Sequence, residues 1–158
     1  MVMVWTVLLL ALIGCCTIGC NGSSSNKEVD RQAILQLLGE YENRLRTGDA
    51  AALEQLYAED AVFMRADAAA IEGKRAIVQM ARDALNEIAL DKKFEIQELV
   101  IEGDWAFARA NSVGTVTVKA TGTTGPEDHD DLFVLQRRDG VWKIARYIYN
   151  SKLPTGTH

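Results

Sequence analysis

The stretch that decides the fold is residues 103–119, which read GDWAFARANSVGTVTVK. Its second half is rich in Val and Thr, whose branched side chains pack well on a pleated sheet. We therefore expect one long strand from Trp105 to about Lys119. The tripeptide EGD at 102–104 is typical of a tight turn, which places an antiparallel partner strand immediately before this one.

Further strands are expected on both sides of this one. Residues 94–101 alternate between apolar and polar side chains, which is the pattern of a half-buried strand. A Gly- and Thr-rich loop over 121–127 leads to a third strand over 131–137. The tripeptide RDG at 138–140 predicts another turn, and residues 141–150 form the last strand. These segments predict an antiparallel meander of four strands.

Helical patterns precede the meander. A capping box at 25–28 and apolar residues at three- and four-residue spacing predict a first helix that ends at Gly48. A second, short helix is expected over 49–57, a strand over 60–65, and a third helix after Gly73. This order favours an α+β domain in which the three helices cover one face of the sheet. A curved sheet over helices leaves a concave, partly apolar space, where small ligands usually bind.

The composition is that of an ordinary globular domain. The chain has 158 residues, of which 48% are hydrophobic and 25% charged, with a net charge of -5. No basic stripe is present, so we expect no nucleic-acid partner. Cys15, Cys16 and Cys20 all lie near the N-terminus, so the rest of the chain has no disulfide and no cysteine metal cluster. The sequence lacks the common nucleotide and zinc motifs, and we predict no cofactor and no metal.

Residues 1–20 are predicted to be a secretory leader. No charged side chain precedes Lys27, and an apolar run is followed by small residues and a polar linker at 21–26. Two segments that end at Cys15 and Cys20 resemble the bacterial lipobox, so one of these cysteines is the expected lipidation site. The alternative is an uncleaved membrane anchor, because about 20 residues can span a bilayer. Either way, the globular part is expected outside the cytoplasm, in the periplasm or at the cell surface, and held near a membrane.

Five segments together resemble the SnoaL-like proteins of the nuclear transport factor 2 superfamily. They are GDAAAL at 48–53, LYAEDAV at 56–62, IEGKRAI at 71–77, GDWAFAR at 103–109 and RDGVWKIAR at 138–146. The resemblance covers 27–150 and leaves 151–158 as a tail. It implies one cone-shaped, cystatin-like domain, with a curved antiparallel sheet wrapped on three N-terminal helices. It also implies a homodimer through the outer face of the sheet.

The resemblance leaves the activity open. Members of the superfamily include isomerases, dehydratases, polyketide cyclases, ligand-binding domains and oligomerisation modules. The chain is also similar to the association domain of calcium/calmodulin-dependent kinase, where the arginine equivalent to Arg109 faces the pocket. Ketosteroid isomerases carry their base where this chain has Arg65, so the isomerase mechanism is not implied.

Arginines and aromatic residues are the candidate ligand-binding residues. Alternation places Trp105, Phe107, Arg109 and Asn111 on one face of the long strand, and Trp142, Ile144, Arg146 and Asn150 on one face of the last strand. An inward-facing guanidinium needs an anionic partner, which predicts a small polar or carboxylate-bearing ligand. The alternative is that the arginines pair with acidic side chains of the domain. The complete set of candidates is Tyr41, Tyr57, Arg65, Trp105, Arg109, Asn111, Arg146 and Asn150.

Three residues are candidates for acid–base chemistry. Asp60 becomes a general base if burial raises its pKa, and otherwise it accepts structural hydrogen bonds. His129 and Asp131 form a possible acid–base pair, although the acidic stretch around them is also typical of a solvated loop. Three functions therefore remain open: a ligand-binding module, a cofactor-free isomerase, hydrolyase or cyclase, and a dimerisation module.

Overall fold

The computed structural model describes residues 22–66 and 68–152. The predicted leader, its two candidate lipidation cysteines and the end of the tail lie outside the described residues. The chain forms α1 (Gly22–Thr47), the 3-10 helix η1 (Ala51–Gln55), β1 (Tyr57–Arg65), β2 (Ile71–Glu72), α2 (Lys74–Glu87), β3 (Ile88–Glu102), β4 (Trp105–Val118), β5 (Thr124–Arg138) and β6 (Val141–Ser151). Within the described ranges, neither α-helix carries an apolar stretch sufficient to span a lipid bilayer.

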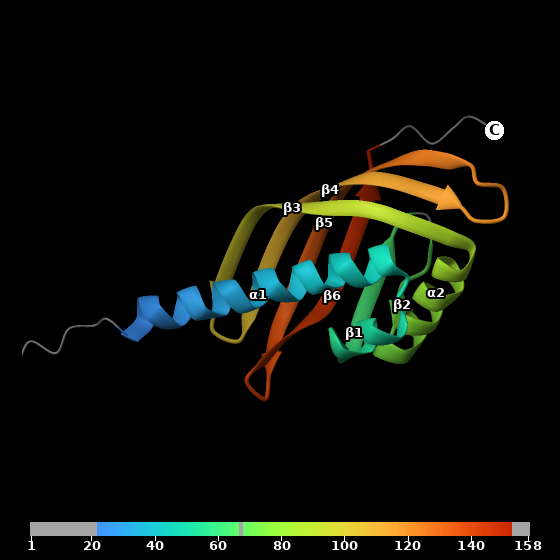
Figure 1. Cartoon of the computed structure of the whole chain (residues 1–158). Coiled ribbons are helices and arrows are strands. Elements are labelled where there is room, and N and C mark those ends of the chain that lie inside the picture. Colours follow the sequence, from blue (N-terminus) through green and yellow to red (C-terminus); the bar gives the residue numbers. More distant parts are fainter. Residues whose placement is uncertain (1–21, 67, 153–158) are drawn as a thin grey trace, which may run out of the picture.

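The strands form one six-stranded sheet in the order β2-β1-β6-β5-β4-β3. The predicted antiparallel meander is confirmed, because β3, β4, β5 and β6 pair in sequence with their neighbours. β1 adds to β6 in parallel, and β2 closes that edge with two residue pairs. Figure 1 shows α1 lying across one face of the curved sheet, with α2 next to β1 and β2 at one end. The α+β architecture is therefore the predicted one.

Several predicted boundaries are wrong, and sheet pairing explains most of them. The second helix is a single 3-10 turn, because Tyr57 already belongs to β1 and pairs with Ile144. β3 begins at Ile88, directly after α2, because its first residues pair with the far end of β4. The predicted loop over 121–127 is strand from Thr124 onward for the same reason. α1 begins at Gly22, before the predicted capping box and inside the predicted linker.

The inner face of β4 carries small residues, not the aromatic ones. Ala106, Ala108, Ala110 and Ser112 are all buried, whereas Trp105 is 46% exposed. Each small residue stands opposite a larger one on a neighbouring strand; Ala108, for example, pairs with Phe133. Alternating small and large residues across strands lets the core fill without overlap. The prediction that Trp105, Arg109 and Asn111 face inward is therefore wrong.

A register shift in β6 changes the side of the sheet on which the side chains of its second half lie. Ile144 pairs with Leu135, but Arg146 pairs with Val134, so one extra residue of β6 is accommodated between them. Such a bulge moves the following side chains to the opposite face. Ile144 and Tyr147 are consequently both buried, while Arg146 and Asn150 lie on the outer face. The uninterrupted alternation predicted for this strand is wrong for that reason.

Two glycines allow a tight turn and a close contact between strands that other residues would strain. Gly140 (φ 78°) follows Asp139 (φ 51°), and two successive positive φ angles make the tight turn that joins β5 to β6. Gly114 faces β3 at its closest approach, where a Cβ would overlap the carbonyl oxygen of Asp91. A side chain at this position would push the two strands apart.

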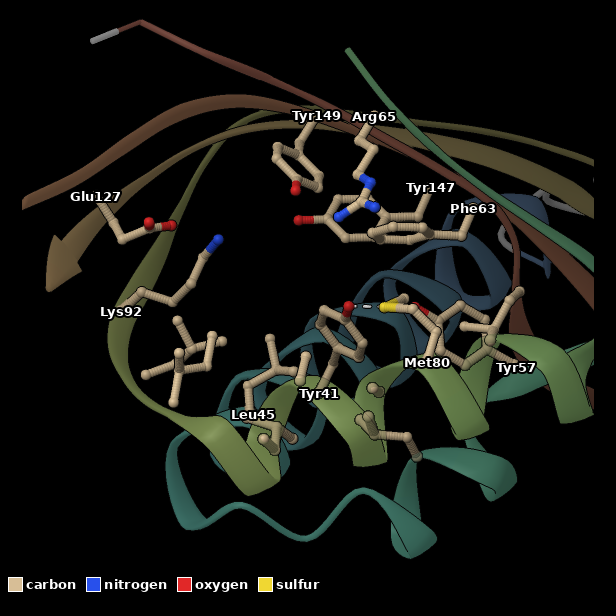
Figure 2. Close-up of a pocket in the computed structure, with 17 residues that line it drawn as sticks. Tyr41, Leu45, Tyr57, Phe63, Arg65, Met80, Lys92, Glu127, Tyr147 and Tyr149 are labelled. Atoms are coloured by element: carbon tan, nitrogen blue, oxygen red, sulfur yellow. Dashed lines mark hydrogen bonds between the residues drawn. The ribbon is translucent and has the colours of Figure 1, made fainter. Parts of the chain in front are cut away.

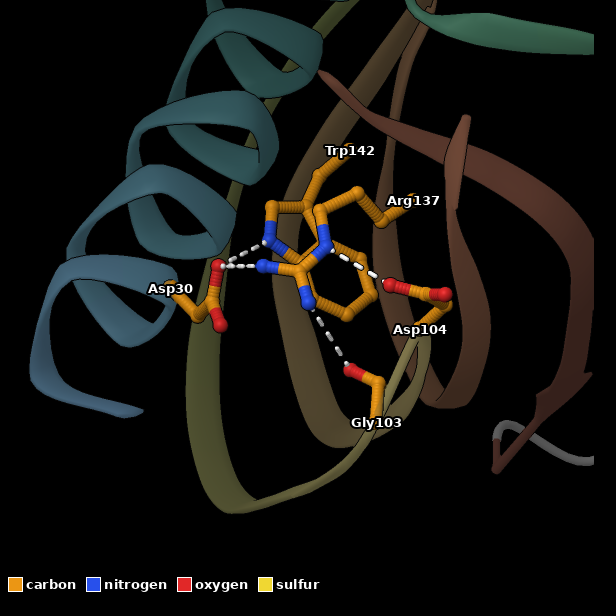
Figure 3. Close-up of polar contacts among 5 residues, drawn as sticks. All are labelled: Asp30, Gly103, Asp104, Arg137 and Trp142. Atoms are coloured by element: carbon orange, nitrogen blue, oxygen red, sulfur yellow. Dashed lines mark hydrogen bonds and ion pairs between the residues drawn. The ribbon is translucent and has the colours of Figure 1, made fainter. Parts of the chain in front are cut away.

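A network of ion pairs and hydrogen bonds attaches α1 to the end of the sheet that carries the turn between β3 and β4 (Figure 3). Asp30 Oδ1 accepts hydrogen bonds from Trp142 Nε1 at 2.9 Å and from Arg137 Nη1 at 2.7 Å. Arg137 also donates to Asp104 Oδ1 at 2.9 Å and to the carbonyl of Gly103 at 3.4 Å. One carboxylate on α1 thereby holds the last strand and, through Arg137, the turn between β3 and β4.

Candidate functional site

A cavity of about 200 Å³ lies between the helices and the inner face of the sheet (Figure 2). Apart from Tyr41 of α1, its helical side is apolar, and its sheet side carries phenolic and charged groups. The lining residues are Tyr41, Leu45, Leu53, Tyr57, Phe63, Arg65, Ile77, Met80, Ala81, Ala84, Leu85, Ile88, Leu90, Lys92, Glu127, Tyr147 and Tyr149. A pocket with an apolar wall and a few convergent polar groups is typical of small-molecule sites.

Buried tyrosines form one wall of the cavity. Tyr57 donates its hydroxyl to the Tyr41 oxygen at 3.1 Å, and Tyr147 donates to Asp131 Oδ1 at 2.7 Å. Burial raises the pKa of Tyr41, Tyr57 and Tyr147 above the ordinary value for a phenol. All three are therefore neutral hydrogen-bond donors at neutral pH, not phenolate bases.

Two cationic side chains point into the same space from different strands, as Figure 2 shows. Lys92 of β3 is only 8% exposed, and Arg65 of β1 is exposed at the mouth of the cavity. Lys92 Nζ lies 5.2 Å from the ring centre of Phe94 and 5.7 Å from that of Tyr149. Neither cation has a side-chain hydrogen bond or an ion pair with any residue in the described ranges. Burial lowers the pKa of Lys92, against the opposing attraction of Asp131 and Glu127.

Three buried polar residues of β4 and β5 lie next to the tyrosines of the cavity. Asp131 is 2% exposed, and its Oδ2 atom has no hydrogen-bond partner among the described residues. His129 is on the same face of β5, and its Nδ1 lies 3.4 Å from Glu127 Oε2. Burial, with a further contribution from the charge of Lys92, lowers the pKa of His129. Ser112 stands directly opposite His129 on β4.

The predicted acid–base residues are placed as follows. His129 and Asp131 are both buried within β5, so the interpretation as a solvated loop is wrong, although no hydrogen bond joins the two among the described contacts. Asp60 lies on an exposed stretch of β1, where Arg138 Nη2 is 2.8 Å from its Oδ1. Burial acts to raise the pKa of Asp60, but the hydrogen bond and charge of Arg138, with smaller contributions from a main-chain hydrogen bond and from Arg146, together hold that pKa below its ordinary value. Asp60 therefore lies outside the cavity lining, and the shift of its pKa is opposite to the one that a general base would need.

The predicted ligand-binding residues divide into two groups. Tyr41, Tyr57 and Arg65 line the cavity, and their binding role stays a prediction. The other five lie on the outer face of the sheet and do not line it: Trp105, Arg109, Asn111, Arg146 and Asn150. Arg109, with a side chain 54% exposed, faces Glu98 at 3.5 Å. Arg146 donates to the main-chain oxygen of Asp60 at 3.1 Å, and Asn111 donates to Asp130 at 3.1 Å.

The sequence-based candidates lack the charged cavity residues Lys92 and Glu127 and the tyrosines Tyr147 and Tyr149. A signal for Lys92 exists in the sequence, because Ile88, Leu90, Lys92 and Phe94 share one face of a strand. A single lysine among apolar residues on the inward face of a strand is a candidate for a cavity-lining residue, as Lys92 is here. The signal was hidden because the predicted strand began only at 94.

The fold, the sheet order and the cavity define an α+β cone of the kind that serves as a scaffold for small-molecule sites. The family model described as a SnoaL-like domain matches residues 38–147, and the chain belongs to that family. No curated protein sequence matches the chain.

Solved structures show the same fold. A ketosteroid isomerase-like protein from Erwinia carotovora atroseptica is 30% identical, with a TM-score of 0.72 over 78% of this chain and 96% of that one. A nuclear transport factor 2-like protein with a cystatin-like fold from Novosphingobium aromaticivorans is 24% identical, with a TM-score of 0.68 over 86% and 92% of the two chains. A calcium/calmodulin-dependent protein kinase II association-domain-like protein from Xanthomonas campestris is 21% identical, with a TM-score of 0.63 over 78% and 87%. The predicted family and the cystatin-like cone are thereby confirmed.

Proposed function

We propose that this protein binds a small single-ring molecule with a carboxylate or another polar acceptor group in the cavity of about 200 Å³. The observation that carries the proposal is that Lys92 and Arg65 face this space beside an apolar wall, without a side-chain hydrogen bond or ion pair to any described residue. A buried cation without a partner is costly, and an anionic ligand would remove that cost. A cavity on the order of 150 Å³ holds benzene, so this volume suits one substituted ring.

The polar groups fit one orientation of such a ligand. The apolar body would lie against Met80 and Leu85 of α2, and the acceptor group would face Arg65 and Lys92. The neutral hydroxyl of Tyr41, which accepts the hydrogen bond from Tyr57, still has its own proton to donate. This arrangement would supply both charge and directional hydrogen bonds to a carboxylate.

The test is thermal unfolding of the purified full chain with 4-methylbenzoate as the probe. Binding at ten times Kd stabilises the folded state by about 1.4 kcal/mol, which raises Tm. Arg65→Gln should weaken binding about tenfold or more, because it removes charge-assisted hydrogen bonds. Arg109→Gln is the matched control, since Arg109 lies on the outer face, and it should leave binding unchanged. Equal effects of the two variants, or no rise in Tm at any probe concentration, would disprove the proposal.

A cofactor-free enzyme is the second candidate, and a specific observation favours it. Asp131 has a buried, unpartnered oxygen and also accepts the hydroxyl of Tyr147, which lines the cavity. The similarity to a ketosteroid isomerase-like protein supports proton transfer next to a carbonyl as the reaction type. Hydrogen–deuterium exchange of a probe ketone, cyclohexanone, followed by NMR, tests this function. Exchange that is no faster than in buffer, or that Asp131→Asn leaves unchanged, would exclude it.

The outer face of the sheet supports the homodimer that the family resemblance implies. Val100, Trp105 and Val113 are each more than 40% exposed on neighbouring strands of that face. Burial of these three side chains between two copies would remove apolar surface from water. Light scattering of the full chain tests this proposal, and Trp105→Asp should shift a dimer to a monomer.

The extracytoplasmic location and the lipid anchor also remain proposals, supported by the pattern of residues 1–20. Metabolic labelling with a radioactive fatty acid in a bacterial host would test them. Cys20→Ala and Cys15→Ala, made separately, should identify the modified residue by loss of label. Label that persists in both variants, or is never incorporated, would contradict the lipoprotein proposal.

A further inference from the structure

Lys92 differs from the other described lysines in its surroundings. Lys27, Lys74 and Lys152 each have a carboxylate within 4 Å, and Lys119 and Lys143 each donate to a main-chain oxygen. Lys93, the next residue, is exposed on the opposite face of the strand. Lys92 has neither kind of partner in the part of the chain that the structure describes, and it lies 8% exposed beside the rings of Phe94 and Tyr149. A buried ammonium without a hydrogen bond has lost much of its hydration, and the cation–π contacts with these two rings offset only part of that cost.

Such surroundings favour the neutral, nucleophilic amine. A desolvated lysine loses its proton more readily, and a lysine in an apolar pocket is a recognised nucleophile for carbonyl compounds. The lowered pKa of Lys92 agrees with this view of the site. The negative charges of Asp131 and Glu127 act to raise the pKa of Lys92, but neither carboxylate lies within ion-pair distance of the amine. The amine also faces open space, because Lys92 lines the cavity that Figure 2 shows.

We propose that Lys92 binds an aldehyde or ketone ligand covalently, as a reversible imine, in this cavity. The inference rests on the proposed ligand-binding function and adds the chemical class of the reacting group. The neutral amine of Lys92 adds to the carbonyl carbon, and one proton moves from the nitrogen to the carbonyl oxygen, which gives a carbinolamine. That hydroxyl leaves as water with a second proton, while the nitrogen loses its own proton, so the net change is amine plus carbonyl to imine plus water.

The residues around Lys92 can move these protons. Glu127 and Tyr149 line the same cavity, and each carries a group that can donate or accept a proton. Arg65 faces the space from β1, where it would hold a carboxylate on the end of the ligand remote from the carbonyl. A ring with a carbonyl at one end and a carboxylate at the other can therefore meet the amine of Lys92 and the guanidinium of Arg65 together.

The experiment uses 4-carboxybenzaldehyde as the probe, with the purified full chain at neutral pH. Sodium cyanoborohydride reduces any imine to a stable secondary amine, and peptide mass spectrometry then locates the adduct. An exposed lysine with an ordinary pKa is about 99.9% protonated at pH 7, and each unit of lowered pKa gives about ten times more free amine. Because the cavity holds the probe beside the Lys92 amine and burial favours the neutral form of that amine, we expect Lys92 to carry the dominant adduct, with more label than Lys93, the matched neighbour in the same chain.

The outcomes separate the two proposals. Equal labelling of Lys92 and Lys93 in the wild-type chain overturns the covalent step without need of any variant. Lys92→Arg keeps the charge but cannot form the imine, so it should abolish the dominant adduct, whereas Lys93→Arg should not. If 4-methylbenzoate raises Tm but no preferential adduct forms, the cavity binds carboxylates and only the imine is refuted. If neither probe acts, both proposals fail.

Discussion

Removal of the Asp30 carboxylate is expected to weaken the attachment of α1 to the sheet. The loss in the free energy of unfolding can be worked out from the two donors that would lose their acceptor. Asp30→Ala deletes the acceptor for Trp142 Nε1 and for Arg137 Nη1. Trp142 is 4% exposed, so its N–H would remain buried without a partner, which costs about 1–3 kcal/mol. Arg137 keeps its bonds to Asp104 and the Gly103 carbonyl, so its share is less than about 1 kcal/mol. We therefore expect the free energy of unfolding to fall by about 2 kcal/mol.

The assay is urea unfolding of the full chain, followed by tryptophan fluorescence and circular dichroism. Asp104→Ala is the matched control, because Asp104 binds the same arginine with a side chain that is 67% exposed. It should cost less than about 1 kcal/mol, as exposed ion pairs do. If the two variants lost equal stability within about 0.5 kcal/mol, the buried hydrogen bond of Trp142 would not hold α1 in place.

Three further predictions concern the core, the sheet and the buried histidine. Phe133→Ala should lower the free energy of unfolding by about 3–5 kcal/mol in the same urea assay, because the ring is 0% exposed; a loss below about 1 kcal/mol would contradict its place in the core. Gly114→Ala should cost about 1–3 kcal/mol, whereas Gly125→Ala, with open space around its Cβ position, should be nearly neutral; the reverse order would refute the close strand contact. Because the pKa of folded His129 is lowered, the unfolded chain binds its proton first, and stability should fall as pH drops through about 6.5. His129→Gln should make that fall shallower, and an unchanged slope in urea titrations between about pH 8 and 5.5 would show that His129 is not the cause.

The order of elements was readable from the sequence because it depends on local signals. The turns at 102–104 and 138–140 and the break at Gly73 each depend on a few neighbouring residues, and all three lie where they were predicted. Strand lengths were less predictable, because β3 and the start of β5 are extended only through pairing with β4. A segment without its own strong pattern becomes a strand when a neighbour offers it hydrogen bonds.

The prediction of the candidate site depends on which face of each strand points inward. Local sequence patterns predict the wrong inward face for β4 and for the second half of β6. On β4 the aromatic residues were assigned to the interior, but the packing of Phe133 opposite Ala108 reserves that face for small side chains. On β6 the extra residue before Arg146 reverses the alternation, and nothing in the local sequence marks it. Tyr41 lies at the cavity on the helix face that the three- and four-residue spacing predicts, and Arg65 follows the buried Phe63 by two residues, beyond the register shift that β1 has between Tyr57 and Val62.

Methyl NMR of the two methionines in β1 and α2 tests most directly whether the enclosed space receives a ligand. Met80 lines the cavity, whereas Met64 lies on the opposite face of the sheet from the cavity residue Phe63. With the chain labelled at its methionine methyl carbons, addition of 4-methylbenzoate should move the Met80 signal, through the ring current of the probe, and leave that of Met64 in place. A probe that shifts Met64 alone, or neither signal at saturating concentration, would mean that the hollow beside Lys92 and Arg65 is not a binding site.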